Sequence, residues 1–362
     1  MTTKLVYALT CNEGGTYIEQ ALLSIYTARY YNPDATIILL IDDKTDELLV
    51  GTRGQVLQYI SEKIVVAFDD KSLSAVYRSR WLKTSCRRLL RGSLLYIDCD
   101  TIVMRSLAPI DDIDGDVVMV HDAHLTVAEY TKQMFELSIK NCAKIGFDAH
   151  QEKCYYNGGV ILVKDTEKGN KLFEAWHNEW KRGTEIKFYG DEPSLMKVNK
   201  MLGYIITELP GIWNCQVFMN PRFVHSAYIT HYWGVVGKRQ SFIYTPQFLN
   251  MVKNDGLTDY VKHCVLNPLN SLLPGNNHMS RFSLKDFWNM ANVLSREIEM
   301  YAAYIDAFSV DFPWLRNMNE KERKAFLNGK YKCCMRLYAL RQYIKIKVFH
   351  QGYSEKEILC TL

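Results

Sequence analysis

Two aspartates stand one residue apart at the end of an apolar run, LLYIDCDTIV (94–103). In an extended segment residues i and i+2 point to the same side, so Asp98 and Asp100 are expected to project together. Two converging carboxylates suit a hard divalent cation such as Mn²⁺ or Mg²⁺, which a bound diphosphate can complete. The alternative is a pair of ordinary strand-end residues, because this spacing is common by chance. The surrounding elements and motifs must separate the two interpretations.

Short apolar runs rich in β-branched residues precede this pair. They are LVYALT (5–10), TIILLID (36–42), KIVVAFD (63–69) and LLYID (94–98), and segments with helical spacing separate them near 18–26, 45–60 and 72–90. This alternation predicts a parallel α/β sheet with helices on both faces. Ligands of such sheets gather at the carboxyl ends of the strands. Thr10, Asn12, Asp98 and Asp100 all follow a predicted strand end.

The later sequence is mixed. Further strands are predicted at 116–122 and 159–165, helices at 129–145 and 166–181, and a loop-rich region at 183–280. We therefore expect an α/β domain over 1–270, followed by a helical, basic region over 280–362. The net charge is +4, but ten basic and two acidic residues give 316–348 a charge of +8.

The basic C-terminal segment has two interpretations. A predicted helix over 330–349 is either a solvated face or a helix that lies on a membrane surface. Nucleic acid is not expected as a partner, because no recognition module accompanies the charge. The N-terminus lacks the pattern of a signal peptide, and the ten cysteines show no metal-ligand spacing. We expect a cytoplasmic protein, with peripheral contact at the membrane surface as the further option.

Four motifs in order carry a family resemblance. LLYIDCDTIV is followed by YYNGGVILV (155–163), GDEPSL (190–195) and HYWGVVGK (231–238), and preceded by RWLK (80–83). Together they resemble family 8 of the GT-A glycosyltransferases, the group that includes glycogenin and lipopolysaccharide galactosyltransferases. The resemblance covers about residues 4 to 240. It implies that 1–270 is a nucleotide-sugar-binding catalytic domain with the GT-A fold, a Rossmann-like mixed sheet. The helical C-terminal appendage falls outside the resemblance.

The resemblance implies a metal site. Asp98 would contact the metal and the donor ribose, Asp100 would bind the metal, and His231 would be the third ligand. Gly234 and Lys238 would contact the donor diphosphate, with Lys238 neutralising the departing group. The alternatives are a packed histidine and a solvated lysine. Lys238 stands one residue later than in the family pattern, and the family's Pro-Trp is absent.

The resemblance also implies a sugar site. Asn157 and Asp191 would hold donor hydroxyls, although Asn157 could be a turn residue and Asp191 a helix N-cap. Arg80 would lie near the phosphates or Asp98, and its alternative is a solvated helix face. Glu192 stands where the family usually has glutamine. A carboxylate there could stabilise an oxocarbenium-like transition state or, as the weaker hypothesis, act as a nucleophile.

The nucleotide base is expected near Thr10, Asn12 and Tyr17, after the first strand, although the match there is imprecise. The predicted function is metal-dependent transfer of a sugar, with retention, from a nucleotide-sugar donor (UDP-linked) to a hydroxyl of a glycan or glycolipid. The alternatives are an inverting GT-A enzyme, a sugar nucleotidyltransferase and a non-catalytic glycan-binding protein.

Overall fold

The computed structural model describes residues 1–268, apart from 133–135, 218, 220–222, 225 and 233–241. A seven-stranded mixed sheet forms its centre, in the order β3-β2-β1-β4-β7-β6-β8. The first four strands of this order are parallel, and β7 runs antiparallel to both β4 and β6. The predicted mixed α/β architecture is confirmed.

The strands are β1 (Lys4–Leu9), β2 (Ile37–Asp42), β3 (Glu62–Val66), β4 (Leu94–Ile97), β5 (Thr101–Val103), β6 (Val117–Thr126), β7 (Cys154–Val163), β8 (Ile206–Glu208), β9 (Cys215–Gln216) and β10 (Ile229–His231). The helices are α1 (Tyr17–Tyr31), α2 (Asp43–Asp46), α3 (Ala75–Leu89), α4 (Val127–Lys132), α5 (Glu136–Ala143), α6 (Glu167–Glu185), α7 (Asp191–Met201), α8 (Pro246–Asp255) and α9 (Asp259–Leu266). Short 3₁₀ segments include η1 (Gly51–Gln58), η2 (Ala108–Asp112), η3 (Gly211–Trp213) and η5 (Phe242–Tyr244).

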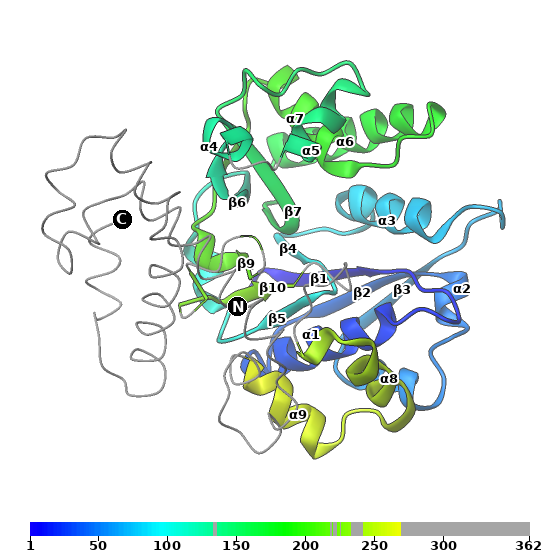
Figure 1. Ribbon diagram of the computed structural model, residues 1–362. Helices are drawn as coiled ribbons and strands as arrows, with labels where there is room; N and C mark the ends of the chain where they lie inside the picture. Colours follow the sequence, from blue (N-terminus) through cyan, green and yellow to red (C-terminus); the bar gives the residue numbers. More distant parts are fainter. Residues whose placement is uncertain (133–135, 218, 220–222, 225, 233–241, 269–362) are drawn as a thin grey trace, which may run out of the picture. The chain divides into compact units, whose positions relative to one another are not determined.

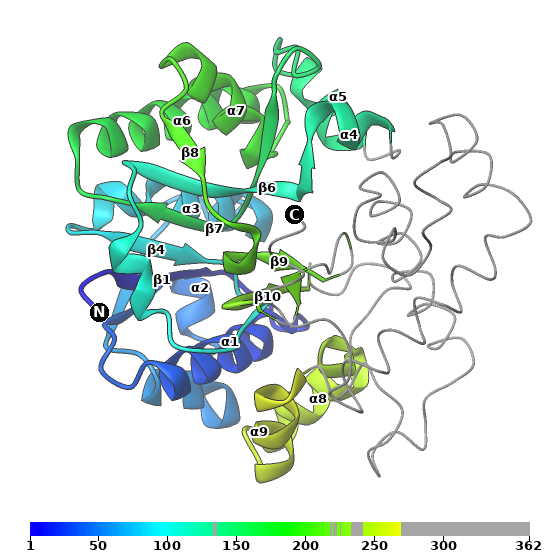
Figure 2. The same ribbon diagram turned by 90° about the vertical axis from the view of Figure 1, so that its left-hand side faces the viewer.

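Helices cover both faces of the sheet. Helix α1 lies on one side of the central strands, and α6 and α7 lie on the other (Figures 1 and 2). Strands β2 and β4 are buried along their whole length, as expected for strands covered on both faces. Their continuous apolar sequence is therefore what this architecture requires.

A second sheet, of order β5-β10-β9, carries part of the candidate site. Strand β10 pairs antiparallel with β5, which places His231 opposite Thr101. It pairs parallel with β9, which places His231 beside Gln216. A histidine far along the chain is thereby brought next to the segment that follows β4.

The structure corrects several expected elements. The helix expected over 45–60 is α2 followed by η1, with a turn and an irregular segment over 47–50 between them. The helix expected over 129–145 is divided into α4 and α5, and the region expected to be loop-rich contains α7, α8 and α9. Asp98 and Asp100 do not extend a strand; they lie in the turn between β4 and β5.

Of the described residues, those within 1–216 and 227–268 form one compact unit. The predicted helical basic region lies outside the described residues, so the domain division stays a prediction. Within the part of the chain that the structure describes, none of the helices combines the length and apolar character needed to cross a bilayer. The seven cysteines of that part are free thiols, and five are buried.

Candidate active site

Asp98, Asp100 and His231 come together as the sequence predicted. One ligand atom from each lies within 4.8 Å of the others, and Nε2 of His231 is 3.2 Å from Oδ1 of Asp100. The turn that carries the aspartates is held by Thr101, whose hydroxyl donates to the Asp98 carbonyl at 2.8 Å. Two carboxylates and one imidazole nitrogen form a donor set that fits Mn²⁺ or Mg²⁺.

Within this cluster, the charges of Asp100 and His231 influence each other. Burial alone would lower the pKa of His231, but the Asp100 carboxylate outweighs it and raises that pKa. Burial would conversely raise the pKa of Asp100, and the histidine charge and hydrogen bond lower it. The pair therefore stabilises a charged arrangement in which a cation could replace the proton.

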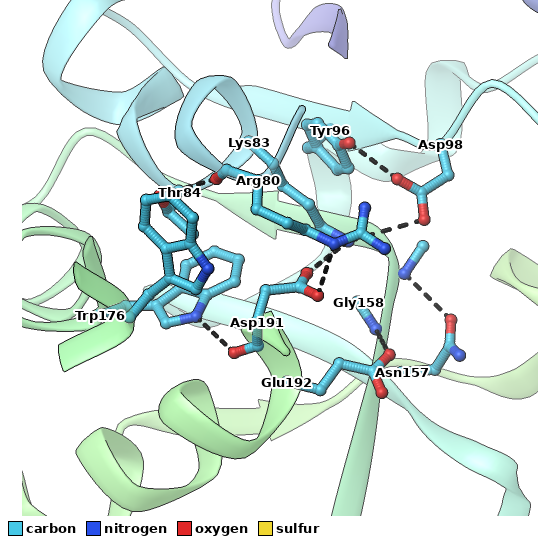
Figure 3. A network of polar contacts seen from close by, with 12 residues as sticks. Arg80, Lys83, Thr84, Tyr96, Asp98, Asn157, Gly158, Trp176, Asp191 and Glu192 are labelled. Carbon is cyan, nitrogen blue, oxygen red and sulfur yellow. Dashed lines mark hydrogen bonds and ion pairs between the residues drawn. The ribbon is translucent and has the colours of Figure 1, made fainter. Parts of the chain in front are cut away.

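Asp98 is oriented by neighbours on its own sheet and on α3. The Tyr96 hydroxyl donates to Asp98 Oδ1 at 2.7 Å, and Nζ of Lys83 lies 3.6 Å from Oδ2 (Figure 3). The lysine is nearly fully buried and also lies over the Tyr96 ring. Its charge is compensated, because Asp191 Oδ2 is 3.0 Å away.

Asp191 connects the basic helix α3 to the N-terminus of α7. Nε of Arg80 lies 2.9 Å from Asp191 Oδ1, and the indole of Trp176 donates to the Asp191 carbonyl at 2.8 Å (Figure 3). Burial raises the pKa of Asp191, but the Arg80 and Lys83 charges outweigh it and hold it at about 2. The structure pairs Arg80 with Asp191, and the placement of Arg80 near the donor phosphates stays a prediction.

Glu192 faces the glycine pair of β7. Its Oε1 accepts a hydrogen bond from the Gly158 amide at 2.9 Å (Figure 3). Burial raises the pKa of Glu192 to about 8, and the nearby carboxylates of Asp122 and Asp191 contribute in the same direction. This side chain is therefore held largely neutral at pH 7, unlike its neighbour Asp191.

Asn157 lies within a buried polar network. Its Oδ1 accepts from the Gly159 amide at 3.0 Å and from Nδ2 of Asn214 at 2.8 Å. Its Nδ2 donates to Oδ1 of Asp122 at 2.9 Å. Asn157 lies near the start of β7, at the carboxyl edge of the parallel strands. Its role in holding a donor hydroxyl stays a prediction.

The two glycines after Asn157 make room for the site. A Cβ on Gly159 would lie 2.3 Å from Cε1 of His231, and a Cβ on Gly158 would lie 2.9 Å from Nζ of Lys83. The close approach of His231 and Lys83 to β7 therefore depends on the absence of side chains at these positions.

The residues predicted for the nucleotide base lie in the loop after β1 and at the first residue of α1. Thr10 donates to the Ala75 carbonyl at 3.0 Å, and Tyr17 is exposed. Arg53 ties this loop to η1: its Nη2 donates to the Gly15 carbonyl, and its Nε contacts Oε1 of Glu19 at 2.6 Å. Asn12 lies in the same loop, where its carbonyl accepts from the Gly15 amide at 2.9 Å.

The remaining predicted positions lie outside the described residues. They are Gly234, Lys238 and the basic C-terminal helix, with its option of membrane contact. Their roles stay predictions.

The family model of glycosyl transferase family 8 matches the chain over residues 55–238, just over half of its 362 residues. The chain belongs to glycosyl transferase family 8. It is a glycosyltransferase, and the predicted resemblance and GT-A fold are confirmed.

Three glycosyltransferases are among the solved structures to which the chain is similar. The bifunctional WbbM has 14% identity and a TM-score of 0.46, covering 72% of this chain and 51% of its own, so this chain spans about half of WbbM. The galactosyltransferase LgtC has 15% identity and a TM-score of 0.45, covering 72% of this chain and 99% of its own. GlyE of Streptococcus pneumoniae TIGR4 has 16% identity and a TM-score of 0.43, and the match covers 74% of this chain and 64% of GlyE. No curated protein matches the chain.

Sequence reasoning missed several members of this family 8 site. Asp122 ends a predicted strand, so the rule that found Asp98 could also have found it. Lys83 stands in the RWLK motif, three residues after Arg80, on the same helix face. Asn214 gave no motif; its signal was one of two amides, with Gln216, within the apolar segment GIWNCQVF.

Proposed function

We propose that this glycosyltransferase moves a sugar from a UDP-linked donor to a hydroxyl of a glycan or glycolipid. The reaction depends on Mn²⁺ or Mg²⁺ and retains the anomeric configuration. The observation that carries the proposal is the convergence of Asp98, Asp100 and His231 at the carboxyl edge of the sheet. Ligands of α/β sheets bind at this edge.

The three ligands would hold the cation against the donor diphosphate. A bound divalent cation would neutralise the charge of the departing nucleotide. The Tyr96 hydroxyl, which donates to Asp98 Oδ1 at 2.7 Å, would hold the Asp98 carboxylate in place for the cation. Lys238 is proposed to contribute further positive charge to the leaving group.

The basic residues of α3 have different roles. The Lys83 side chain is 3% exposed and lies between two carboxylates, so it positions Asp98 and Asp191. The Arg80 side chain is 37% exposed and can reach an anionic ligand while Nε keeps its contact with Asp191. We assign Arg80 to the donor and Lys83 to the ordering of the acidic groups.

Asp191 and Asn157 are proposed to face the donor sugar, and Thr10, Asn12 and Tyr17 the nucleotide base. Glu192 is proposed to stabilise positive charge at the anomeric carbon, a role for its ionised form. The pKa of about 8 places this ionisation just above neutral pH. The acceptor then attacks on the face from which the nucleotide departs, which gives an α-linkage from an α-linked donor.

A thermal-shift screen tests the proposal. Nucleotide sugars are added one at a time to the full chain, with and without Mn²⁺. We expect one UDP-sugar with Mn²⁺ to stabilise the protein, by about 2.7 kcal/mol at a hundredfold excess over its Kd. No stabilisation by any pair would contradict the proposed donor. The anomeric configuration of the product, measured by NMR, then separates retention from inversion.

A further inference from the structure

Strands β6 and β7 leave their regular pairing at two successive places beside the site. Between the pairs Met119–Ile161 and His121–Tyr156, β6 advances by two positions and β7 by five. From there to the next pair, at Thr126, β6 advances by five positions and β7 by two. Each strand therefore bulges once, and bulges next to active sites serve to re-aim side chains.

The two bulges meet through their first residues. Asp122 opens the β6 bulge and Asn157 opens the β7 bulge, and Nδ2 of Asn157 donates to Oδ1 of Asp122 at 2.9 Å. Asp122 also lies close to Glu192, because its charge is, after burial, the main cause of the raised pKa of Glu192. The β6 bulge thus turns a buried carboxylate toward the part of the site assigned to the donor sugar.

The β6 bulge requires a backbone conformation that its residues disfavour. Ala123 and His124 have φ angles of 51° and 57°, in the left-handed region that residues other than glycine rarely adopt. Both residues are buried. Such a conformation persists only where the surrounding structure determines it, and it is concentrated at functional sites. Contacts from outside β6 must therefore hold these two residues.

Gln216 of β9 supplies these contacts. Its Oε1 accepts from the Ala123 amide at 2.8 Å, and its Nε2 donates to the His121 carbonyl at 3.0 Å. Its backbone amide donates to Nε2 of His124 at 3.4 Å. The side chain is fully buried, and it binds the backbone on both sides of Asp122 with one acceptor and one donor.

We infer that Gln216 is a positioning residue for the transfer reaction, because it holds the β6 bulge in the conformation that directs Asp122 to Asn157. The inference rests on the proposed function, in which Asn157 faces the donor sugar. Gln216 acts through Asp122, so its removal should impair the reaction only while the Asp122 carboxylate is present.

The first arm of the test needs neither metal nor substrate. The exchange rate of the Ala123 amide and the side-chain amide signal of Asn157 are followed by ¹H–¹⁵N NMR in the full chain. We expect a protected Ala123 amide in the wild type and about tenfold or faster exchange in Gln216→Met. The Asn157 signal should move toward its position in Asp122→Asn. Exchange in the wild type as fast as that of an exposed amide, or unchanged signals in Gln216→Met, would overturn the inference.

The matched control is Asn199→Leu. It removes another buried amide, one that accepts from the Ile206 backbone amide at 2.9 Å, and should change neither signal. If Gln216→Met does not fold, Gln216→Glu replaces it, because a carboxylate keeps the acceptor for Ala123 and loses only the donor to His121. The same changes are then expected at smaller size, and wild-type signals would count against the inference.

The second arm is a double-mutant cycle on UDP release, with the UDP-sugar that the thermal-shift screen identifies. We expect Gln216→Met to lower kcat/KM about 10- to 100-fold, as misplacement of a substrate-facing group does. In the Asp122→Asn background the same substitution should have an effect of less than about twofold. Equal losses in both backgrounds, or a fully active Asp122→Asn beside an impaired Gln216→Met, would show that Gln216 does not act through Asp122.

The two arms separate this inference from the proposed function. A chain that releases UDP from none of the donors would contradict the proposed function, and the Ala123 and Asn157 signals would still decide whether Gln216 holds the bulge. A chain that releases UDP equally well with and without Gln216 would overturn the inference and leave the proposed function standing.

Discussion

At the scale of single residues, the site gives two adjacent carboxyl groups, Asp191 and Glu192, very different pKa values. Asp191 is held ionised, with a pKa of about 2, because Arg80 and Lys83 offset its burial. Glu192 instead accepts a hydrogen bond from the Gly158 backbone amide, and burial raises its pKa to about 8. Such separation is typical of sites in which neighbouring acids have different tasks.

The pKa of Glu192 makes stability depend on pH. Between its ordinary pKa near 4.5 and the folded value of about 8, the folded state binds the additional proton, so stability falls as pH rises through this window. Glu192→Gln removes the effect. We expect urea denaturation to show a flatter profile for the variant between pH 5 and 8, by about 3.5 kcal/mol. The exposed control Glu185→Gln should keep the wild-type slope; an identical slope in Glu192→Gln would contradict the assigned pKa.

Catalysis should respond to Glu192 as well. If its anion stabilises positive charge at the anomeric carbon, turnover should rise with pH toward 8, and Glu192→Gln should lower kcat by about tenfold or more. Steady-state rates of UDP release, measured at several pH values, test this. Near wild-type turnover in Glu192→Gln would rule out both the electrostatic and the nucleophilic role.

At the scale of elements, strand β7 is the part of the sheet on which the site is built. Its glycine pair allows His231 from β10 and Lys83 from α3 to approach. The two positions differ in what a methyl group would meet: a buried ring at Gly159, and the end of a flexible side chain at Gly158.

This contrast gives a paired prediction. Gly159→Ala should displace the His231 ring and weaken Mn²⁺ binding about tenfold or more, as loss of ligand orientation does. Gly158→Ala should leave Mn²⁺ affinity within a few-fold of wild type, because the Lys83 chain can move. Calorimetric titration with Mn²⁺ checks both, and equal losses in the two variants would contradict the geometry.

The buried pair of Arg53 and Glu19 should stabilise the loop after β1. Removing the cation alone leaves a buried carboxylate uncompensated, which costs about 3–5 kcal/mol. We expect Arg53→Met to lose stability of this order in urea denaturation, and Arg53→Met with Glu19→Leu to recover much of it. A double variant as unstable as the sum of both single variants would show that the two side chains are not coupled.

Much of the element order could be predicted from local sequence. The strands β1, β2 and β4 are continuous apolar runs, and burial on both faces leaves few other options for such segments. The turn at Asp98–Asp100 could not be predicted, because the run continues through Thr101 to Val103 and only tertiary pairing with β10 divides it. The division of the segment after residue 45 into α2 and the 3₁₀ segment η1 was likewise not indicated by its helical spacing.

At the scale of the whole molecule, the site was predictable where ligand types and strand ends coincide. Asp98 and Asp100 met that condition, whereas His231 was indicated by the family resemblance alone, in a region expected to be loop-rich. The structure brings all three together. Lys83 and Asn214 were not found, because their roles come from partners distant in sequence, Asp191 and His231, that no local pattern indicates. Membership of glycosyl transferase family 8 then fixes the class of reaction.

The most direct test of the central claim is metal-dependent release of UDP. The full chain is incubated with each UDP-hexose and a panel of glycan acceptors, in Mn²⁺ or in EDTA, and free UDP is measured for the wild type and for Asp100→Asn. We predict release for one donor in Mn²⁺, and at least a hundredfold loss both in EDTA and in Asp100→Asn, because either change removes charge stabilisation of the leaving group. Equal rates in Mn²⁺ and EDTA, with Asp100→Asn fully active, would contradict the account.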